Sequence, residues 1–435
     1  MALAFPSVIH QAARDWSNAA KNDRADVFLL GDSIAQSLDG GLTNAIQNNY
    51  GVAGSGITAS IGASGYTTAG LASFEMSYPF PNGSMGLSEN ISDVPSARQG
   101  YVLTFGAPVT AAATPGNFLS FFLQPNTYLP ESAAYDWHLY TTTPVGLSGS
   151  MTATRLMQQA PNTIYQVVGP LSTATPVGNN LQHSVFSFNA IPSAAGVYSG
   201  AHLTDITNTS ILYSRILRPN VKGATITSWG YGSKSTLDMI TDKLNPMTAQ
   251  GRATFLNAMV DGGSGKLMVM IEEGNNDHAF STPSIRGVAP TNTAAGFNDN
   301  LTYLMDIIRQ AWVLTGRTSN DLSFLLIGLY EKNPIADPDG SAFIRGSAQV
   351  MRDVANANAD TSFVDIYSFA PNWLAASNAG YMADDIHPTM VGANFYANGI
   401  VAQLLPEPTS LSAIALISIA LLRRKNRIRH QRSIS

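Results

Sequence analysis

A short apolar run near the amino terminus, Val27-Phe28-Leu29-Leu30-Gly31-Asp32-Ser33, ends at a glycine, an aspartate and a serine. A stretch compatible with a helix, residues 34–49, follows it. This pattern predicts a buried strand that leads through a turn into a helix. The Ser33 hydroxyl would then lie at the end of a strand and beside a helix N-terminus, where backbone N–H groups stabilise anions. The alternative is a plain turn in which Asp32 or Ser33 only caps the helix.

Four later apolar runs repeat this pattern. The predicted strands are residues 25–30, 224–228, 266–271, 322–329 and 362–366. Between the third and fourth strands, apolar residues recur at helical spacing, at Phe297, Leu301, Leu304, Ile308 and Trp312. Residues 342–356 form a second helix candidate between the fourth and fifth strands. Strands that alternate with helices predict a parallel sheet with helices on both faces.

The interval between the first two of these strands has a different character. It contains short β-type runs punctuated by Pro, Gly, Asn and Ser, at residues 100–105, 117–123, 137–142, 163–168, 183–188 and 211–216. Regular short strands with turn signals are typical of a sandwich or barrel. We therefore predict an inserted all-β, sandwich-like domain over residues 51–215. One long decorated loop is the alternative, and its length argues against it.

Composition limits the function classes. Only 12% of the 435 residues are charged, and the chain has no cysteine, which excludes disulfides and thiolate metal sites. The net charge is −5 although six basic residues gather in 423–432, so the rest of the chain is more acidic. Without a basic stripe to displace phosphate counterions, nucleic acid is not an expected partner. The seven histidines do not form metal-ligand spacings, and we expect no metal and no cofactor.

Three further motifs follow the later strands. Asp384 precedes His387 by three residues, a spacing that lets the carboxylate accept the Nδ1–H bond that orients an imidazole base. Asn276, after the third strand, is a candidate amide donor to an oxyanion. Gly232, after the second strand, is a candidate backbone donor, with Gly230 as its competitor. Ligands bind where parallel strands end in open α/β sheets, so these motifs point to one site.

The order Ser, Gly, Asn, Asp-x-x-His resembles the SGNH, or GDSL-type, hydrolase family. Its blocks are matched by Gly31-Asp32-Ser33, Gly232, 274–277 and 384–387, and the resemblance covers residues 25–49 and 216–402. It implies a flavodoxin-like three-layer α/β/α fold with about five parallel strands. It also implies a serine esterase: nucleophile Ser33, base His387, orienting Asp384, and an oxyanion hole of Ser33, Gly232 and Asn276.

The carboxyl terminus resembles a second known element, the PEP-CTERM sorting signal. Pro406-Glu407-Pro408 precedes an apolar stretch, 411–422, and a basic cluster follows. The resemblance implies a transient membrane anchor and delivery to the cell surface. Such proteins carry a secretion signal, which residues 1–9 do not provide, so we expect the true start to lie upstream. The predicted division is 1–50 with 216–402 as the hydrolase, 51–215 as the β domain and 403–435 as the sorting segment.

Several substrate classes fit these motifs. We expect O-acetyl groups on carbohydrate, because the aromatic residues Tyr135, Trp137 and Tyr140 could stack on sugars, although sandwich core is the alternative for them. A lipase or thioesterase of the same fold is a rival, as is a non-catalytic surface protein that binds carbohydrate. A glycosidase using Glu272 and Glu273 is disfavoured, since adjacent acids on a strand point to opposite faces.

Overall fold

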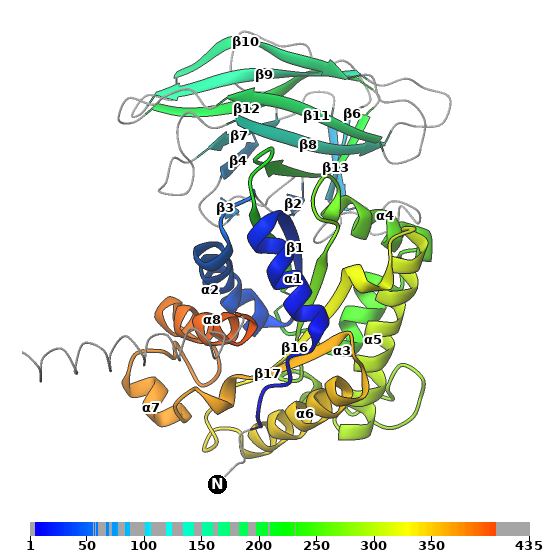
Figure 1. Ribbon diagram of the computed structural model, residues 1–435, viewed down its shortest axis with the longest axis vertical. Coiled ribbons are helices and arrows are strands. Elements are labelled where there is room, and N and C mark those ends of the chain that lie inside the picture. The colour runs from blue at the N-terminus through cyan, green and yellow to red at the C-terminus, as the bar shows by residue number, and fades with distance from the viewer. Residues whose placement is uncertain are drawn as a thin grey trace, which may run out of the picture.

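A five-stranded parallel sheet forms the centre of the molecule (Figure 1). The computed structural model describes residues 5–54, 56, 209–230 and 232–405, and within 57–208 it describes the strands. The sheet order is β14-β1-β15-β16-β17, which is 2-1-3-4-5 along the chain, the expected flavodoxin-like order. Each strand agrees with its prediction to within two residues. The bounds are β1 Arg24–Gly31, β14 Gly223–Gly230, β15 Leu267–Glu272, β16 Leu322–Gly328 and β17 Thr361–Asp365.

Helices cover both faces of this sheet. Val27 and Leu29 of β1 pack with α1, α2 and α8, whereas Phe28 and Leu30 pack with α4, α5 and α6. Burial on both faces explains why β1 is a continuous apolar run rather than an alternating one. The predicted helices at 297–312 and 342–356 are confirmed as α5 and α6. The helices are α1 Gln11–Asn22, α2 Ser33–Tyr50, α3 Thr236–Asp238, α4 Ala249–Val260, α5 Ala294–Leu314, α6 Pro338–Ala357, α7 Trp373–Asn378 and α8 Met390–Leu404, with short turns η1 Met239–Leu244, η2 Asp277–Ala279, η3 Ser319–Asp321 and η4 Ile366–Ser368.

Two antiparallel sheets are inserted between α2 and β14, as predicted (Figure 1). One has the order β10-β9-β12-β7-β4-β3; the other has the order β11-β8-β13-β6-β5, with β2 paired to β13. All six predicted β runs are strands, and β2, β3, β4, β5, β9 and β12 are additional to them. The bounds are β2 Thr58–Ala59, β3 Thr67–Thr68, β4 Ala72–Met76, β5 Gly83–Leu87, β6 Tyr101–Phe105, β7 Leu119–Leu123, β8 Ala134–Thr142, β9 Ser150–Gln159, β10 Ile164–Ala174, β11 Gln182–Asn189, β12 Val197–Thr207 and β13 Thr209–Leu217.

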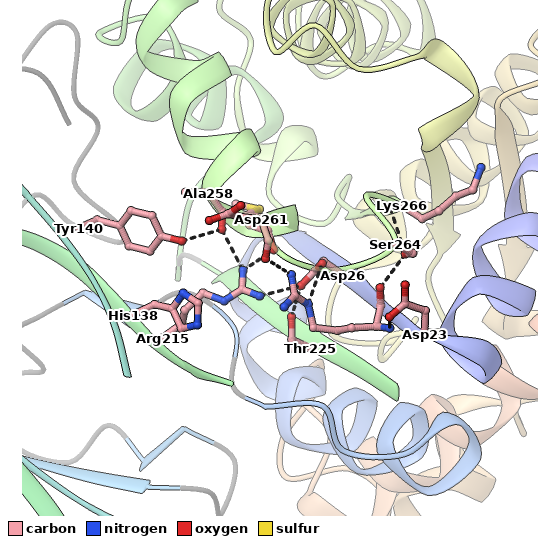
Figure 2. Close-up of polar contacts among 12 residues, drawn as sticks. Asp23, Asp26, His138, Tyr140, Arg215, Thr225, Ala258, Asp261, Ser264 and Lys266 are labelled. Atoms are coloured by element: carbon pink, nitrogen blue, oxygen red, sulfur yellow. Dashed lines mark hydrogen bonds and ion pairs between the residues drawn. The ribbon is translucent and has the colours of Figure 1, made fainter. Parts of the chain in front are cut away.

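Buried polar contacts join this β region to the α/β core (Figure 2). Arg215 of β13 donates to the Ala258 carbonyl at 2.9 Å and forms an ion pair with Asp26 at 3.4 Å. Thr225 of β14 donates to the same Asp26 carboxylate. The Tyr140 hydroxyl of β8 also donates to the Ala258 carbonyl, at 3.1 Å. The end of α4 and the middle of β1 are thus the docking points for the inserted sheets.

Two of the three aromatic residues proposed to bind sugars are core residues instead. Trp137 is 0% exposed and Tyr140 is 2% exposed. Tyr140 stacks on His183 with ring centroids 4.5 Å apart, so its ring face is already covered. The sugar-stacking role was therefore wrong for these two residues, because β8 lies at the docking interface. The side chain of Tyr135 is outside the described part.

The predicted sorting segment falls almost wholly outside the described residues, which end at Leu405 just after α8. The apolar helix at 411–422 and the division into segments at 50/51, 215/216 and 402/403 stay predictions. Among the helices that the structure describes, none is both long enough and apolar enough to cross a bilayer.

Candidate active site

The predicted nucleophile lies at the junction of β1 and α2. β1 ends at Gly31, and Asp32 caps α2 by accepting the Ile34 N–H at 2.7 Å, so Ser33 is the first helical residue. A side chain at position 31 would not fit, since its Cβ would lie 2.1 Å from the Glu272 carbonyl oxygen. Asp32 therefore caps the helix, and Ser33 is half-buried at its first position.

The Asp-x-x-His motif lies in the loop between α7 and α8 and meets this serine. His387 Nε2 is 2.9 Å from Ser33 Oγ, across 354 positions of sequence. His387 Nδ1 is 2.8 Å from Asp384 Oδ2. Because a carboxylate can only accept, Nδ1 carries the proton and Nε2 is left as the acceptor for the serine hydroxyl. The structure therefore brings Ser33, His387 and Asp384 into one hydrogen-bonded chain.

Asp384 is held as a carboxylate by its own loop. Its Oδ1 accepts the backbone N–H groups of Ile386 at 2.8 Å and His387 at 2.7 Å. Partial burial raises the pKa of Asp384, but these N–H bonds and the His387 ring outweigh it, so the pKa lies below its ordinary value. The carboxylate that contacts the His387 ring is therefore ionised at neutral pH.

Two residues at the end of β16 support the histidine loop, and the sequence alone did not indicate them. The buried Tyr330 hydroxyl donates to the Ile386 carbonyl at 2.5 Å. Asn333 donates through its backbone N–H to the Asp385 carbonyl at 2.9 Å and through Nδ2 to the Asp385 carboxylate at 2.7 Å. Asp385 is thus an anchor of the loop, whereas Asp384 contacts the imidazole. Their signal in the sequence is a polar run directly after the fourth strand.

Asn276 follows β15 and lies beside the nucleophile turn. Its Nδ2 donates to the Lys234 carbonyl at 2.9 Å and to Asp32 Oδ2 at 3.3 Å. Its Oδ1 accepts from the Asn275 amide at 3.2 Å, which fixes the orientation of the side chain. One amide hydrogen therefore faces the Lys234 carbonyl, and the other faces Asp32, the residue adjacent to Ser33, through the longer bond.

The two candidate glycines after β14 have different surroundings. A Cβ at Gly230 would lie 2.5 Å from the Gln36 backbone nitrogen, so this glycine allows α2 to pack closely on β14. Gly232 is exposed, and the nearest atom to a Cβ there is the Gln36 side-chain oxygen at 3.9 Å. Close packing against α2 explains why position 230 is a glycine. Of the two glycines, Gly232 is the one whose backbone is accessible.

The adjacent acids of β15 do not reach solvent. Glu272 is 0% exposed and Glu273 is 1% exposed. A glycosidase needs two carboxyl groups that flank a substrate, and these two are enclosed. His278, in the turn after this strand, donates from Nδ1 to the Asn275 carbonyl and contacts Asp337 through Nε2 at 3.0 Å, so it ties this turn to the start of α6. Within the described ranges, no group of three or more His, Asp or Glu side chains is arranged to hold a metal ion.

No protein family model and no curated protein matches this chain. Among solved structures, a peptidoglycan O-acetylesterase matches with a TM-score of 0.55 and 15% identity, over 90% of this chain and 94% of that chain. The central sheet and its helices have the SGNH hydrolase fold. At 15% identity this match supports a common fold, which includes both the α/β core and the inserted sheets.

Two further solved structures match parts of this chain at lower scores. A lipase/acylhydrolase from Enterococcus faecalis has a TM-score of 0.27 and 16% identity, over 42% of this chain and 76% of that chain. A family 22 carbohydrate-binding module of Clostridium thermocellum has a TM-score of 0.25 and 13% identity, over 37% and 91%.

Proposed function

We propose that the protein is a serine esterase that works through an acyl-enzyme. The observation that supports this proposal is the row of hydrogen bonds that joins Ser33, His387 and Asp384. The distance from Ser33 Oγ to His387 Nε2 is 2.9 Å, and that from His387 Nδ1 to Asp384 Oδ2 is 2.8 Å. Ser33 Oγ attacks the ester carbonyl carbon while His387 Nε2 takes its proton. The tetrahedral intermediate collapses, and His387 returns that proton to the leaving alkoxide. Water, activated by the same imidazole, then hydrolyses the acyl-serine and restores the enzyme.

Three donors are assigned to the developing oxyanion: the backbone N–H groups of Ser33 and Gly232 and the Asn276 amide. In the resting structure the Asn276 amide makes a longer bond to Asp32, 3.3 Å, than to Lys234, 2.9 Å. We assign the hydrogen of the longer bond to the oxyanion, because it is the one that costs least to redirect. Removal of one such donor typically costs about 3 kcal/mol of transition-state stabilisation.

For the substrate we propose O-acetyl groups on a polysaccharide. The support is the likeness in fold to a peptidoglycan O-acetylesterase, which extends over 90% of this chain and so includes the inserted sheets. A polysaccharide substrate agrees with the export to the cell surface that we propose from the carboxyl-terminal motif. Release of an acetyl group requires only a small acyl pocket beside Ser33.

The test compares wild type with Ser33→Ala on p-nitrophenyl acetate, a long-chain p-nitrophenyl ester and O-acetylated peptidoglycan. Wild type should hydrolyse the acetyl ester faster than the long-chain ester and release acetate from the polymer. Ser33→Ala should lose at least about 10³-fold in kcat on each substrate while keeping its circular dichroism spectrum. Turnover by Ser33→Ala at the wild-type rate would refute the esterase proposal. A preference for the long-chain ester would refute only the acetyl specificity.

A further inference from the structure

A buried pair of carboxyl groups lies beside the nucleophile, and the steps above use neither of them. Asp32 comes between the last residue of β1 and Ser33, and Glu272 is the last residue of β15. The parallel register of these strands sets Gly31 opposite Glu272. Both carboxyl groups are 0% exposed. An ionised carboxylate is costly to bury unless donors or opposite charges surround it.

The two groups differ in the donors around them. Asp32 Oδ1 accepts the Ile34 N–H at 2.7 Å, and Oδ2 accepts the Asn276 amide at 3.3 Å. Among the described residues, no side-chain donor lies within hydrogen-bond distance of either Glu272 oxygen. Its polar neighbours are the Asp32 carboxyl and the backbone N–H groups of Asp32 and Ala35. A protonated Glu272 can donate its O–H to Asp32, whereas an ionised Glu272 would be a second carboxylate without side-chain donors.

We propose that Glu272 is kept as the neutral acid, donates its O–H to the Asp32 carboxylate, and through Asp32 positions the Asn276 amide for the oxyanion. This inference rests on the proposed esterase function. Asp32 then has three donors, from Ile34, Glu272 and Asn276. Because its charge is already largely satisfied, the bond to Asn276 stays weak, and the amide hydrogen can pass to the oxyanion.

The electrostatics of the site agree with this arrangement. Burial raises the pKa of Glu272 well above its ordinary value, and the neighbouring Asp32 carboxylate adds to the effect. Burial also raises the pKa of Asp32, to about 6, against the opposing effect of its hydrogen bonds and of His387. Of the two groups, Glu272 therefore keeps the proton and Asp32 carries the charge. The other titratable groups near the pair are Tyr330, Glu273, Asp277, Asp238 and Asp384.

Replacing each carboxyl group by its amide tests the asymmetry of the pair. Glu272→Gln still offers an N–H donor to Asp32 and should keep kcat on p-nitrophenyl acetate within about threefold of wild type. Asp32→Asn has one side-chain oxygen for the three donors, so either orientation turns its NH2 toward the Ile34 N–H or toward the Asn276 amide. We expect it to lower kcat by about 100-fold, the effect of one misplaced oxyanion donor. A role in packing alone would leave both isosteric variants near the wild-type rate.

A third variant and a pH series separate positioning from packing. Glu272→Leu keeps the volume and removes the donor, so we expect a loss of kcat of about 10-fold or more relative to Glu272→Gln. At alkaline pH, where Glu272 loses its proton, wild-type kcat should fall relative to Glu272→Gln, whose amide cannot titrate. A Glu272→Gln rate as low as that of Asp32→Asn, or a wild-type rate in Asp32→Asn, would overturn the proposal.

A readout without turnover keeps the inference separate from the esterase function. Infrared difference spectra of the folded wild type and Glu272→Gln at pH 7 should show the loss of one carboxylic acid C=O band. If wild type hydrolyses no ester, the esterase proposal fails, and this band still reports whether Glu272 is neutral. If the substitution removes a carboxylate band instead of an acid band, Glu272 is ionised, and the proposed hydrogen bond to Asp32 is refuted even if the enzyme is active.

Discussion

At the scale of single residues, the hydrogen bonds of Asp384 determine the orientation and the tautomer of the His387 ring. Two backbone N–H groups occupy one carboxylate oxygen, so only the other oxygen is left for the imidazole. The loop thus dictates which oxygen faces His387, and with it the tautomer of the ring. A three-residue spacing is enough for this because all the partners lie within one turn of chain.

Asp384→Asn should therefore be nearly inactive although it is isosteric. Its single oxygen will accept the two backbone N–H groups, which leaves its NH2 facing His387 Nδ1. The ring is then forced to carry its proton on Nε2, pointing at Ser33, and kcat should fall by about 10³-fold to 10⁴-fold. Steady-state kinetics would check this, with Asp353→Asn on the surface of α6 as the control. A loss of less than tenfold would contradict the assignment of the tautomer.

At the scale of elements, the polar residues after β16 hold the loop between α7 and α8. Tyr330 and Asn333 contact Ile386 and Asp385, the two residues directly before His387. Tyr330 in turn stacks on Tyr396 of α8, with ring centroids 4.6 Å apart. The loop that carries His387 is thus fixed from the sheet on one side and from the following helix on the other.

Substitution of Asn333 should lower turnover although this residue acts through the loop that carries His387 and not on the substrate. Asn333→Ala removes the bond to the Asp385 carboxylate and should lower kcat by about 10-fold at unchanged KM, because a loosened loop misplaces the imidazole. Asn333→Asp sets two carboxylates together and should be worse. The exchange Asn333→Asp with Asp385→Asn restores a complementary pair, so it should recover much of the rate. No recovery in the double variant would count against the proposed anchor.

At the scale of the whole molecule, two kinds of buried charge occur. At the docking interface, Asp26 is paired with the buried Arg215 and with Arg24 (Figure 2). At the edge of the site, Asp277 has no cationic partner among the residues that the structure describes: it accepts from the Thr236 N–H and hydroxyl, and burial raises its pKa to about 7. Buried acids of the second kind favour the folded state only while they are protonated.

Stability should accordingly fall as the solution becomes more alkaline. The pKa values of Asp277, Glu272 and Glu273 are raised in the folded state, so these three groups bind more protons in the folded chain than in the unfolded chain above about pH 4. Their stabilising contribution is complete below the unfolded pKa and is lost as the pH passes the folded pKa. Thermal unfolding should give a lower midpoint at about pH 8 than at about pH 5. Asp277→Asn should flatten this dependence; a midpoint that rises over this range would contradict it.

The sequence by itself was sufficient for the five strands, their parallel order and the three residues of the hydrogen-bonded chain. Apolar runs buried on both faces have an unmistakable pattern, and the Asp384–His387 contact is local. Gly31, Asp32 and Ser33 are likewise adjacent, so a strand followed by a helix already implies their geometry.

Only the tertiary structure decided which side chains support the site and which merely fill the core. Glu272 meets Asp32 across two strands, and Asn333 meets Asp385 from another loop. Such contacts depend on how distant elements pack, and no local pattern encodes them. The same reason explains the error at Trp137 and Tyr140: whether an aromatic strand residue faces solvent or a neighbouring unit is determined by the docking of the inserted sheets on α4 and β1.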